Sequence, residues 1–149
     1  MAKKFNGVPA TILLIEDNDA DVILAEEALG DGKIRNVVHR VKDGLEALDF
    51  LNKVGDFQDA PRPDVILLDL NMPRMDGREF LEAIKDDREK TSIPIIVLTT
   101  SEAETDVAKS YDLNVNCYIQ KPVGFSDFVS IVHSIEHFWF SVVSLPDYA

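Results

Sequence analysis

The sequence predicts an α/β fold, a doubly wound parallel sheet of five strands accompanied by five helices. Strand-like and helix-like patterns alternate five times along the 149 residues, which is typical of this class. Three of the strand candidates, residues 11–15, 65–68 and 95–98, are almost wholly apolar, as expected of strands covered on both faces. Hydrophobic residues make up 46% of the chain, enough for one domain with a sizeable core.

The first third of the chain predicts a strand, a helix and a second strand. The strand over 11–15 ends directly in two acidic residues. Apolar side chains at helical spacing then predict a helix over 20–29, with Asn18 or Asp19 as its cap. The strand over 36–42 is more polar, so we expect it nearer the sheet edge.

The middle third contains the strand on which the predicted chemistry depends. A helix over 45–54 and a Gly- and Pro-containing loop over 55–63 lead to the strand 65–68. Asp69 stands where that strand ends, and burying its carboxylate costs free energy unless a cation or hydrogen bonds meet it. We therefore expect Asp69 at the carboxyl edge of a central strand, facing a crevice. A helix over 78–87 follows.

The last third predicts a connector over 90–94 and a strand over 95–98. A helix over 102–112, a strand over 117–119 and a helix over 127–143 follow. Ser101 and Glu104 have the spacing of a capping box. The final helix is apolar on more than one side. It is either a core helix with a few loose aromatic residues or, as we prefer, the interface of a homodimer through Phe138, Trp139, Phe140 and Val143.

Composition excludes several classes of function. The net charge of −12 argues against binding to a nucleic acid backbone. The single cysteine rules out an internal disulfide and a Cys-based zinc site. The sequence has neither a signal peptide pattern nor an apolar run long enough for a membrane span, so we expect a cytoplasmic protein that does not enter membranes.

Polar side chains follow the predicted strands at their carboxyl ends. The first strand is followed by Glu16 and Asp17, the third by Asp69, the fourth by Thr99 and the fifth by Lys121. In a parallel sheet these ends share one edge, so side chains that are distant in sequence converge.

This set of side chains indicates a metal site and a phosphoryl acceptor. Clustered carboxylates repel one another, and a divalent cation bound by oxygen ligands, Mg²⁺ or Mn²⁺, relieves the repulsion. Glu16, Asp17 and Asp69 are the candidate ligands, together with a backbone carbonyl near Asn71. An aspartate can form an aspartyl phosphate. Lys121 and the Thr99 hydroxyl then offer charge and a hydrogen bond to the phosphoryl oxygens.

The motifs resemble those of the receiver domain of two-component response regulators. The resemblance rests on five motifs in order: Glu16-Asp17, the segment Leu68–Gly77, Leu98-Thr99, Tyr118 and Lys121-Pro122. It covers about residues 10–143. It therefore implies a flavodoxin-like sheet with strand order 2-1-3-4-5. Residues 1–9 would form a lead-in and 10–149 one receiver domain, without an output domain.

The resemblance also implies roles for individual residues. Asp69 would accept a phosphoryl group from a histidine of a sensor kinase, with Mg²⁺ at Glu16, Asp17, Asp69 and the Asn71 carbonyl. Lys121 would pair with the phosphoryl group, and Thr99 and Tyr118 would act as the switch. The switch would alter the surface formed by residues 102–112, 117–119 and 127–143. The loop over 55–63 and the aromatic C-terminal segment resemble the stand-alone regulators of bacterial and cyanobacterial phytochrome kinases.

Two other functions compete with a phosphorylation switch. A Mg²⁺-dependent phosphatase with an aspartate nucleophile uses similar groups, but it usually needs an acid two residues after the nucleophile, where this chain has Asn71. A receiver-like interaction module that is never phosphorylated is the third candidate, and the complete set of five groups argues against it.

Overall fold

Five parallel strands form the centre of the fold. The computed structural model describes residues 9–30, 35–70, 72, 74–110, 113, 115 and 117–120. Within these residues the strands are β1 Ala10–Ile15, β2 Asn36–Val41, β3 Val65–Asp69, β4 Ile95–Thr99 and β5 Cys117–Gln120. They form one sheet in the order β2-β1-β3-β4-β5, with every neighbouring pair parallel. The predicted fold class and strand order are confirmed, with β3 central and the more polar β2 at an edge.

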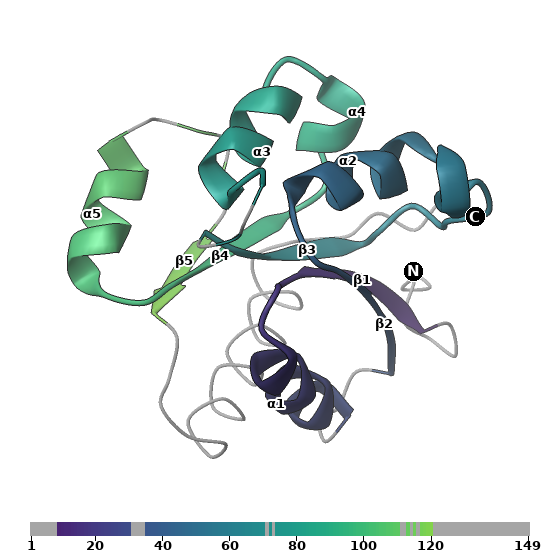
Figure 1. The fold of residues 1–149 in the computed structure, drawn as a ribbon, viewed down its shortest axis with the longest axis horizontal. Helices are drawn as coiled ribbons and strands as arrows, with labels where there is room; N and C mark the ends of the chain where they lie inside the picture. The colour runs from purple at the N-terminus through teal and green to yellow at the C-terminus, as the bar shows by residue number, and fades with distance from the viewer. Residues whose placement is uncertain are drawn as a thin grey trace, which may run out of the picture.

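Helices cover both faces of the sheet (Figure 1). They are α1 Asp19–Gly30, α2 Gly44–Asn52, α3 Gly77–Ile84, α4 Arg88–Thr91 and α5 Glu102–Ser110, with a 3-10 turn, η1, at Gly55–Phe57. The helix α1 lies on one side of the sheet, and α2 and α3 lie on the other (Figure 1). Four of the predicted helices correspond to α1, α2, α3 and α5, and the one predicted over 127–143 lies outside the described residues.

Three predicted segments differ from the structure. The helix expected over 78–87 ends at Ile84, and Asp87 caps a separate short helix, α4, by accepting hydrogen bonds from the backbone N–H groups of Glu89 and Lys90. The segment 90–94 is therefore partly helical rather than a plain connector. The expected loop 55–63 begins with the turn η1.

The apolar strands supply side chains to two separate core layers. Val65 and Leu67 of β3 pack in the layer that includes α1, while Ile66 and Leu68 pack in the layer that includes α2 and α3. All five residues of β3 are buried. The uninterrupted apolar run is therefore explained by burial on alternate faces.

Short polar side chains begin the helices. Asn18 caps α1 by accepting a hydrogen bond from the Asp21 N–H at 3.0 Å, which decides between the two predicted caps. Ser101 accepts from the Glu104 N–H at 3.1 Å, so half of the predicted capping box forms. The Glu104 carboxylate instead accepts hydrogen bonds from the N–H and the hydroxyl of Thr100, one residue before the position that a capping box requires.

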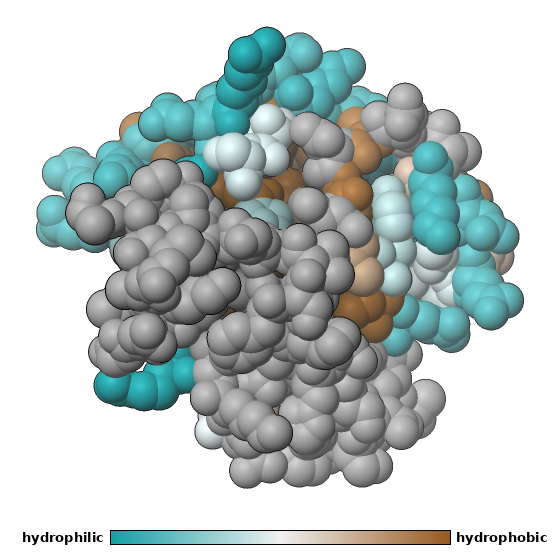
Figure 2. All heavy atoms as spheres, turned by 180° about the vertical axis from the view of Figure 1, so that it is seen from behind, coloured by the Kyte–Doolittle hydropathy of each residue, from teal (hydrophilic) through white to brown (hydrophobic). Residues whose placement is uncertain are grey.

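The outer surface of the described residues is largely polar. Seen from behind, hydrophilic side chains of the described residues lie along the upper edge and the sides of the molecule, and hydrophobic ones show between them (Figure 2). None of the described helices combines the length and apolar character needed to cross a bilayer.

Candidate functional site

Three carboxylates converge at the carboxyl edge of the sheet. Glu16 and Asp17 directly follow β1, and Asp69 is the last residue of the neighbouring β3. One carboxylate oxygen from each lies within 4.8 Å of the others. Glu16 and Asp69 are 2% and 3% exposed, whereas Asp17 is exposed. Asp69 thus lies at the carboxyl end of the central strand, as expected, and the cluster combines two buried acids with one that is exposed.

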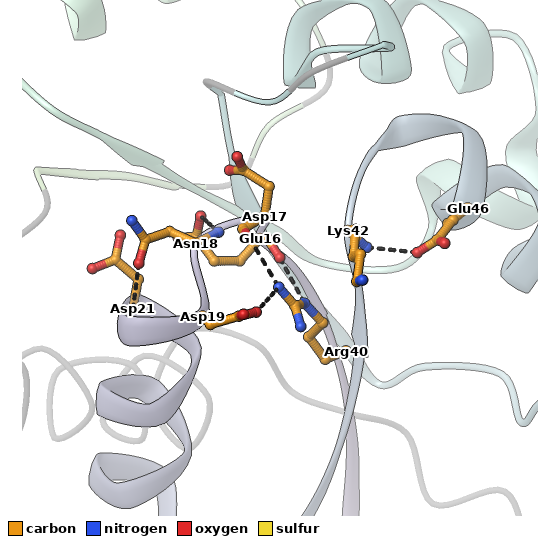
Figure 3. A network of polar contacts seen from close by, with 8 residues as sticks. All are labelled: Glu16, Asp17, Asn18, Asp19, Asp21, Arg40, Lys42 and Glu46. Carbon is orange, nitrogen blue, oxygen red and sulfur yellow. Dashed lines mark hydrogen bonds and ion pairs between the residues drawn. The ribbon is translucent and has the colours of Figure 1, made fainter.

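Hydrogen bonds shape the segment that carries the first two acids. The Glu16 N–H donates to the Val41 carbonyl of β2 at 3.0 Å, which extends the β1–β2 pairing by one residue. The Glu16 carboxylate accepts from the Asn18 N–H at 3.3 Å. The side chain of Asp17 points away from the Arg40 guanidinium, which lies against the other side of this segment (Figure 3).

A close backbone approach positions the loop that follows Asp69. The Gly77 N–H at the start of α3 donates to the Leu70 carbonyl at 3.0 Å. A Cβ at position 77 would lie 2.8 Å from the Leu70 Cα and 2.9 Å from the Asp69 carbonyl oxygen. These distances are too short for any side chain, so glycine at this position lets α3 begin against the end of β3.

An ion pair between the exposed side chain of Arg74 and the buried carboxylate of Asp43 joins the same loop to the corner between β2 and α2. Asp43, 3% exposed, caps α2 and accepts a hydrogen bond from Arg74 Nε at 2.7 Å. Arg74 has a left-handed backbone conformation with φ of 60°. The Gly44 N–H donates to the Met75 carbonyl at 2.9 Å. Arg74 and Met75 are thus both attached to the start of α2.

Thr99 ends β4 and is completely buried. Its hydroxyl lies 2.6 Å from the hydroxyl of Thr105 on α5, and the Thr105 hydroxyl donates to the Ser101 carbonyl at 3.1 Å. A hydroxyl has one proton to donate, so Thr99 is the donor to Thr105. The predicted switch threonine is therefore engaged with the first turns of α5.

Tyr118 lies on β5, half-buried against the core layer that includes α2 and α3. The ammonium group of Lys109 is 5.7 Å from the centroid of its ring. The tyrosine also lines a cavity of about 150 Å³ that includes Leu70 from the loop after β3 and Val107 from α5. The ring thus borders the loop after β3 and the helix α5.

The donor set fits a hard divalent cation. The three ligand groups that converge are all carboxylates, and oxygen ligands favour Mg²⁺ or Mn²⁺ over metals that prefer nitrogen or sulfur. Asp69 at the end of a buried strand, with two further acids beside it, also provides the nucleophile and the metal ligands that phosphoryl transfer to a carboxylate requires.

The structure brings together part of the predicted site. Glu16, Asp17 and Asp69 form one cluster, and Thr99 lies one position beyond Leu98, the residue of β4 that pairs with Asp69. Tyr118 is described on β5, and the remaining predicted site residues lie outside the described residues: Asn71, Lys121, Phe138, Trp139, Phe140 and Val143.

Sequence reasoning missed two side chains that hold these predicted residues. Arg40 contacts the segment of Glu16 and Asp17, and Thr105 accepts the hydrogen bond of Thr99. Neither belongs to a motif. The predicted strand order places β2 beside β1, but it does not indicate which side chain of β2 reaches the acids.

Known proteins share this fold and much of this sequence. A model of the response regulator receiver domain family matches residues 12–133. Response regulator Rcp1 of Synechocystis sp. is 46% identical over 138 residues, which are 93% of this chain and 94% of that protein. The crystal structure of the phosphorylated cyanobacterial phytochrome response regulator RcpA matches with a TM-score of 0.83 and 47% identity, covering 94% of this chain and 100% of that one. The Mn²⁺-bound form of Rcp1 matches with a TM-score of 0.81 and 45% identity, covering 93% and 100%.

Proposed function

This chain belongs to the response regulator receiver domain family, and from that premise we propose that it is a signalling switch phosphorylated on Asp69. The donor is a phosphohistidine of a sensor kinase. One observation carries the proposal: Asp69 ends the buried central strand, and its carboxylate lies within 4.8 Å of carboxylate oxygens of Glu16 and Asp17. The Mn²⁺-bound structure of Rcp1 supports Mg²⁺ or Mn²⁺ as the cation at these three residues.

The proposed reaction transfers one phosphoryl group between two side chains. A carboxylate oxygen of Asp69 attacks the phosphorus atom, and the phosphorus–nitrogen bond of the donor histidine breaks. The electron pair of that bond returns to the imidazole, which takes a proton from solvent, and Asp69 becomes an aspartyl phosphate. A bound divalent cation supplies charge neutralisation to the transferred oxygens. The chain assists its own phosphorylation and dephosphorylation.

Four other residues complete the proposed site. Lys121 pairs with the phosphoryl group, and the Asn71 carbonyl provides a further oxygen ligand to the cation. Thr99 moves its hydrogen bond from Thr105 to a phosphoryl oxygen, and Tyr118 turns inward with it. Through this exchange phosphorylation changes the contacts of α5, because α5 carries Thr105 and borders the cavity that Tyr118 lines.

We propose a phytochrome-type histidine kinase as the partner. RcpA, named as a phytochrome response regulator, resembles 94% of this chain at 47% identity. We take residues 10–149 as one receiver domain, of which the family match covers 12–133. The net charge of −12 disfavours nucleic acid as a further partner. Because such kinases draw their phosphoryl groups from ATP, we place the protein in the cytoplasm.

Chemical phosphorylation tests the assignment of Asp69. We expect acetyl phosphate with Mg²⁺ to add one phosphoryl group to the protein, detected by intact mass, and we expect Asp69→Asn to abolish the addition. Asp64→Asn is the matched control, because Asp64 is buried at the opposite end of β3, where it accepts a hydrogen bond from the Thr11 N–H at 2.7 Å. Modification of Asp69→Asn, or turnover of unrelated phosphomonoesters, would overturn the proposal in favour of another site or a phosphatase.

We also propose that the chain forms a homodimer through Phe138, Trp139, Phe140 and Val143. The support is the sequence of residues 127–143, which is more apolar than one buried helix face requires. We expect sedimentation of a dimer at micromolar concentration for the wild type and of a monomer for Phe140→Asp. Ile23→Asp, which adds the same charge at an exposed apolar residue of α1, should leave the dimer intact. A monomeric wild type would refute this assembly.

A further inference from the structure

Arg40 of the edge strand β2 crosses to the segment that carries two of the three acids. Its Nε donates to the Glu16 carbonyl at 2.8 Å, and one of its Nη atoms donates to the Asp17 carbonyl at 3.1 Å. The same Nη atom lies 2.8 Å from a carboxylate oxygen of Asp19. Figure 3 shows this guanidinium against the turn between β1 and α1, with the Asp17 side chain on the far side.

The two carbonyl contacts matter more than the ion pair. Asp19 is 84% exposed and Arg40 is 22% exposed, and ion pairs with so exposed a partner contribute little free energy. The carbonyls of Glu16 and Asp17, by contrast, belong to consecutive peptide groups just past the end of β1. A rigid guanidinium that binds both carbonyls restricts the orientation of both peptides. It thereby restricts the directions in which the Glu16 and Asp17 side chains leave the backbone.

We propose that Arg40 is a positioning residue for the divalent cation site. It holds the backbone of Glu16 and Asp17 so that their carboxylates face Asp69 before the cation binds. Residues that orient metal ligands from outside the coordination sphere commonly contribute strongly to metal affinity. This inference rests on the proposed function in one respect, namely that Glu16 and Asp17 bind the cation.

The charge of Arg40 and its positioning role have opposite effects on the affinity for Mg²⁺. A guanidinium beside the acidic segment repels an incoming cation, so removing the charge without any change in geometry would tighten Mg²⁺ binding. Loss of positioning would weaken it. The sign of the effect therefore separates the two roles, and a lysine at position 40 keeps the charge while losing the planar fork.

Calorimetric titration of the full-length protein with Mg²⁺ tests the positioning role. We expect both Arg40→Lys and Arg40→Gln to bind Mg²⁺ roughly ten-fold more weakly than the wild type. Arg62→Gln is the matched control, because Arg62 also bridges two segments, donating to the Glu89 carbonyl at 3.1 Å and to the Ser92 hydroxyl at 2.7 Å. We expect this control, and Asp19→Asn, to bind as the wild type does. Circular dichroism in EDTA checks that each variant is folded, and if Arg40→Gln does not fold, Arg40→Lys decides.

The outcomes separate this inference from the function on which it rests. Wild-type affinity in Arg40→Lys, or tighter binding in Arg40→Gln, would overturn the positioning role while leaving the phosphorylation switch in place. Failure of the wild type to bind Mg²⁺ at all would overturn both. Weaker Mg²⁺ binding in the two Arg40 variants, together with unchanged binding in Arg62→Gln, would establish the positioning role of Arg40.

Discussion

Replacing Thr105 by valine should favour the phosphorylated arrangement of the switch. Thr99 is completely buried, and its hydroxyl donates to the Thr105 hydroxyl at an oxygen–oxygen distance of 2.6 Å. Valine keeps the shape of the side chain but removes the acceptor. A buried hydroxyl that loses its partner costs about 1–3 kcal/mol. This cost falls on the unphosphorylated protein, since in the proposed phosphorylated state Thr99 donates to a phosphoryl oxygen instead.

The expected shift can be measured with beryllofluoride, which mimics a phosphoryl group on a carboxylate. If about 1–2 kcal/mol of the penalty is relieved on binding, the affinity of Thr105→Val for beryllofluoride in Mg²⁺ rises by a factor of about 5–30. Urea unfolding without beryllofluoride should show a loss of about 1–2 kcal/mol in stability. With saturating beryllofluoride, part of that loss should disappear.

Thr105→Ser is the control for this prediction because it retains the hydroxyl and should behave as the wild type. The reasoning would be refuted if Thr105→Val were destabilised equally with and without beryllofluoride. A lower affinity of Thr105→Val for beryllofluoride would refute it as well, since it would mean that Thr105 supports the phosphorylated state rather than competing with it.

Two further predictions concern packing and protonation. Gly77→Ala should lower the free energy of unfolding in urea by about 1–3 kcal/mol, because its Cβ would lie 2.8 Å from the Leu70 Cα. Gly30→Ala, where a Cβ meets nothing within 4 Å, should change it by less than about 1 kcal/mol, and equal losses would contradict the steric explanation. Burial raises the pKa of the Cys117 thiol, against the opposing charge of Lys109, so the folded chain should react slowly with iodoacetamide at neutral pH and faster as the pH rises. Equal rates for the folded and the urea-unfolded chain at neutral pH would contradict this.

Local patterns explain why much of the site could be predicted. An apolar run such as Val65–Leu68 has few stable places other than a strand covered on both faces, and the strand observed there is buried throughout. The acids that follow β1 and the acid that ends β3 then meet, because parallel strands end at one edge. The cap of α1 at Asn18 was similarly predictable, because a capping side chain bonds to its own helix.

Contacts between distant segments were not predictable in this way. Arg40 is 24 residues from Glu16 in the chain. The predicted strand order placed β2 beside β1, but the contact also depends on the register of the pairing, in which Arg40 lies opposite Leu14. Thr105 lies close to Thr99 in sequence, but its selection as a partner depends on the angle at which α5 leaves β4. The short helix α4 was missed because four residues are too few to show helical periodicity.

The sequence by itself determined the class of fold, the strand ends at which acids gather and the identity of Asp69 as the candidate phosphoacceptor, because each of these follows from burial and from spacing along the chain. Only the tertiary structure decided which side chains hold those acids and the switch threonine in place. Hydrogen bonds of this kind act over about 3 Å, and which groups come within that distance is set by how the strands and helices pack.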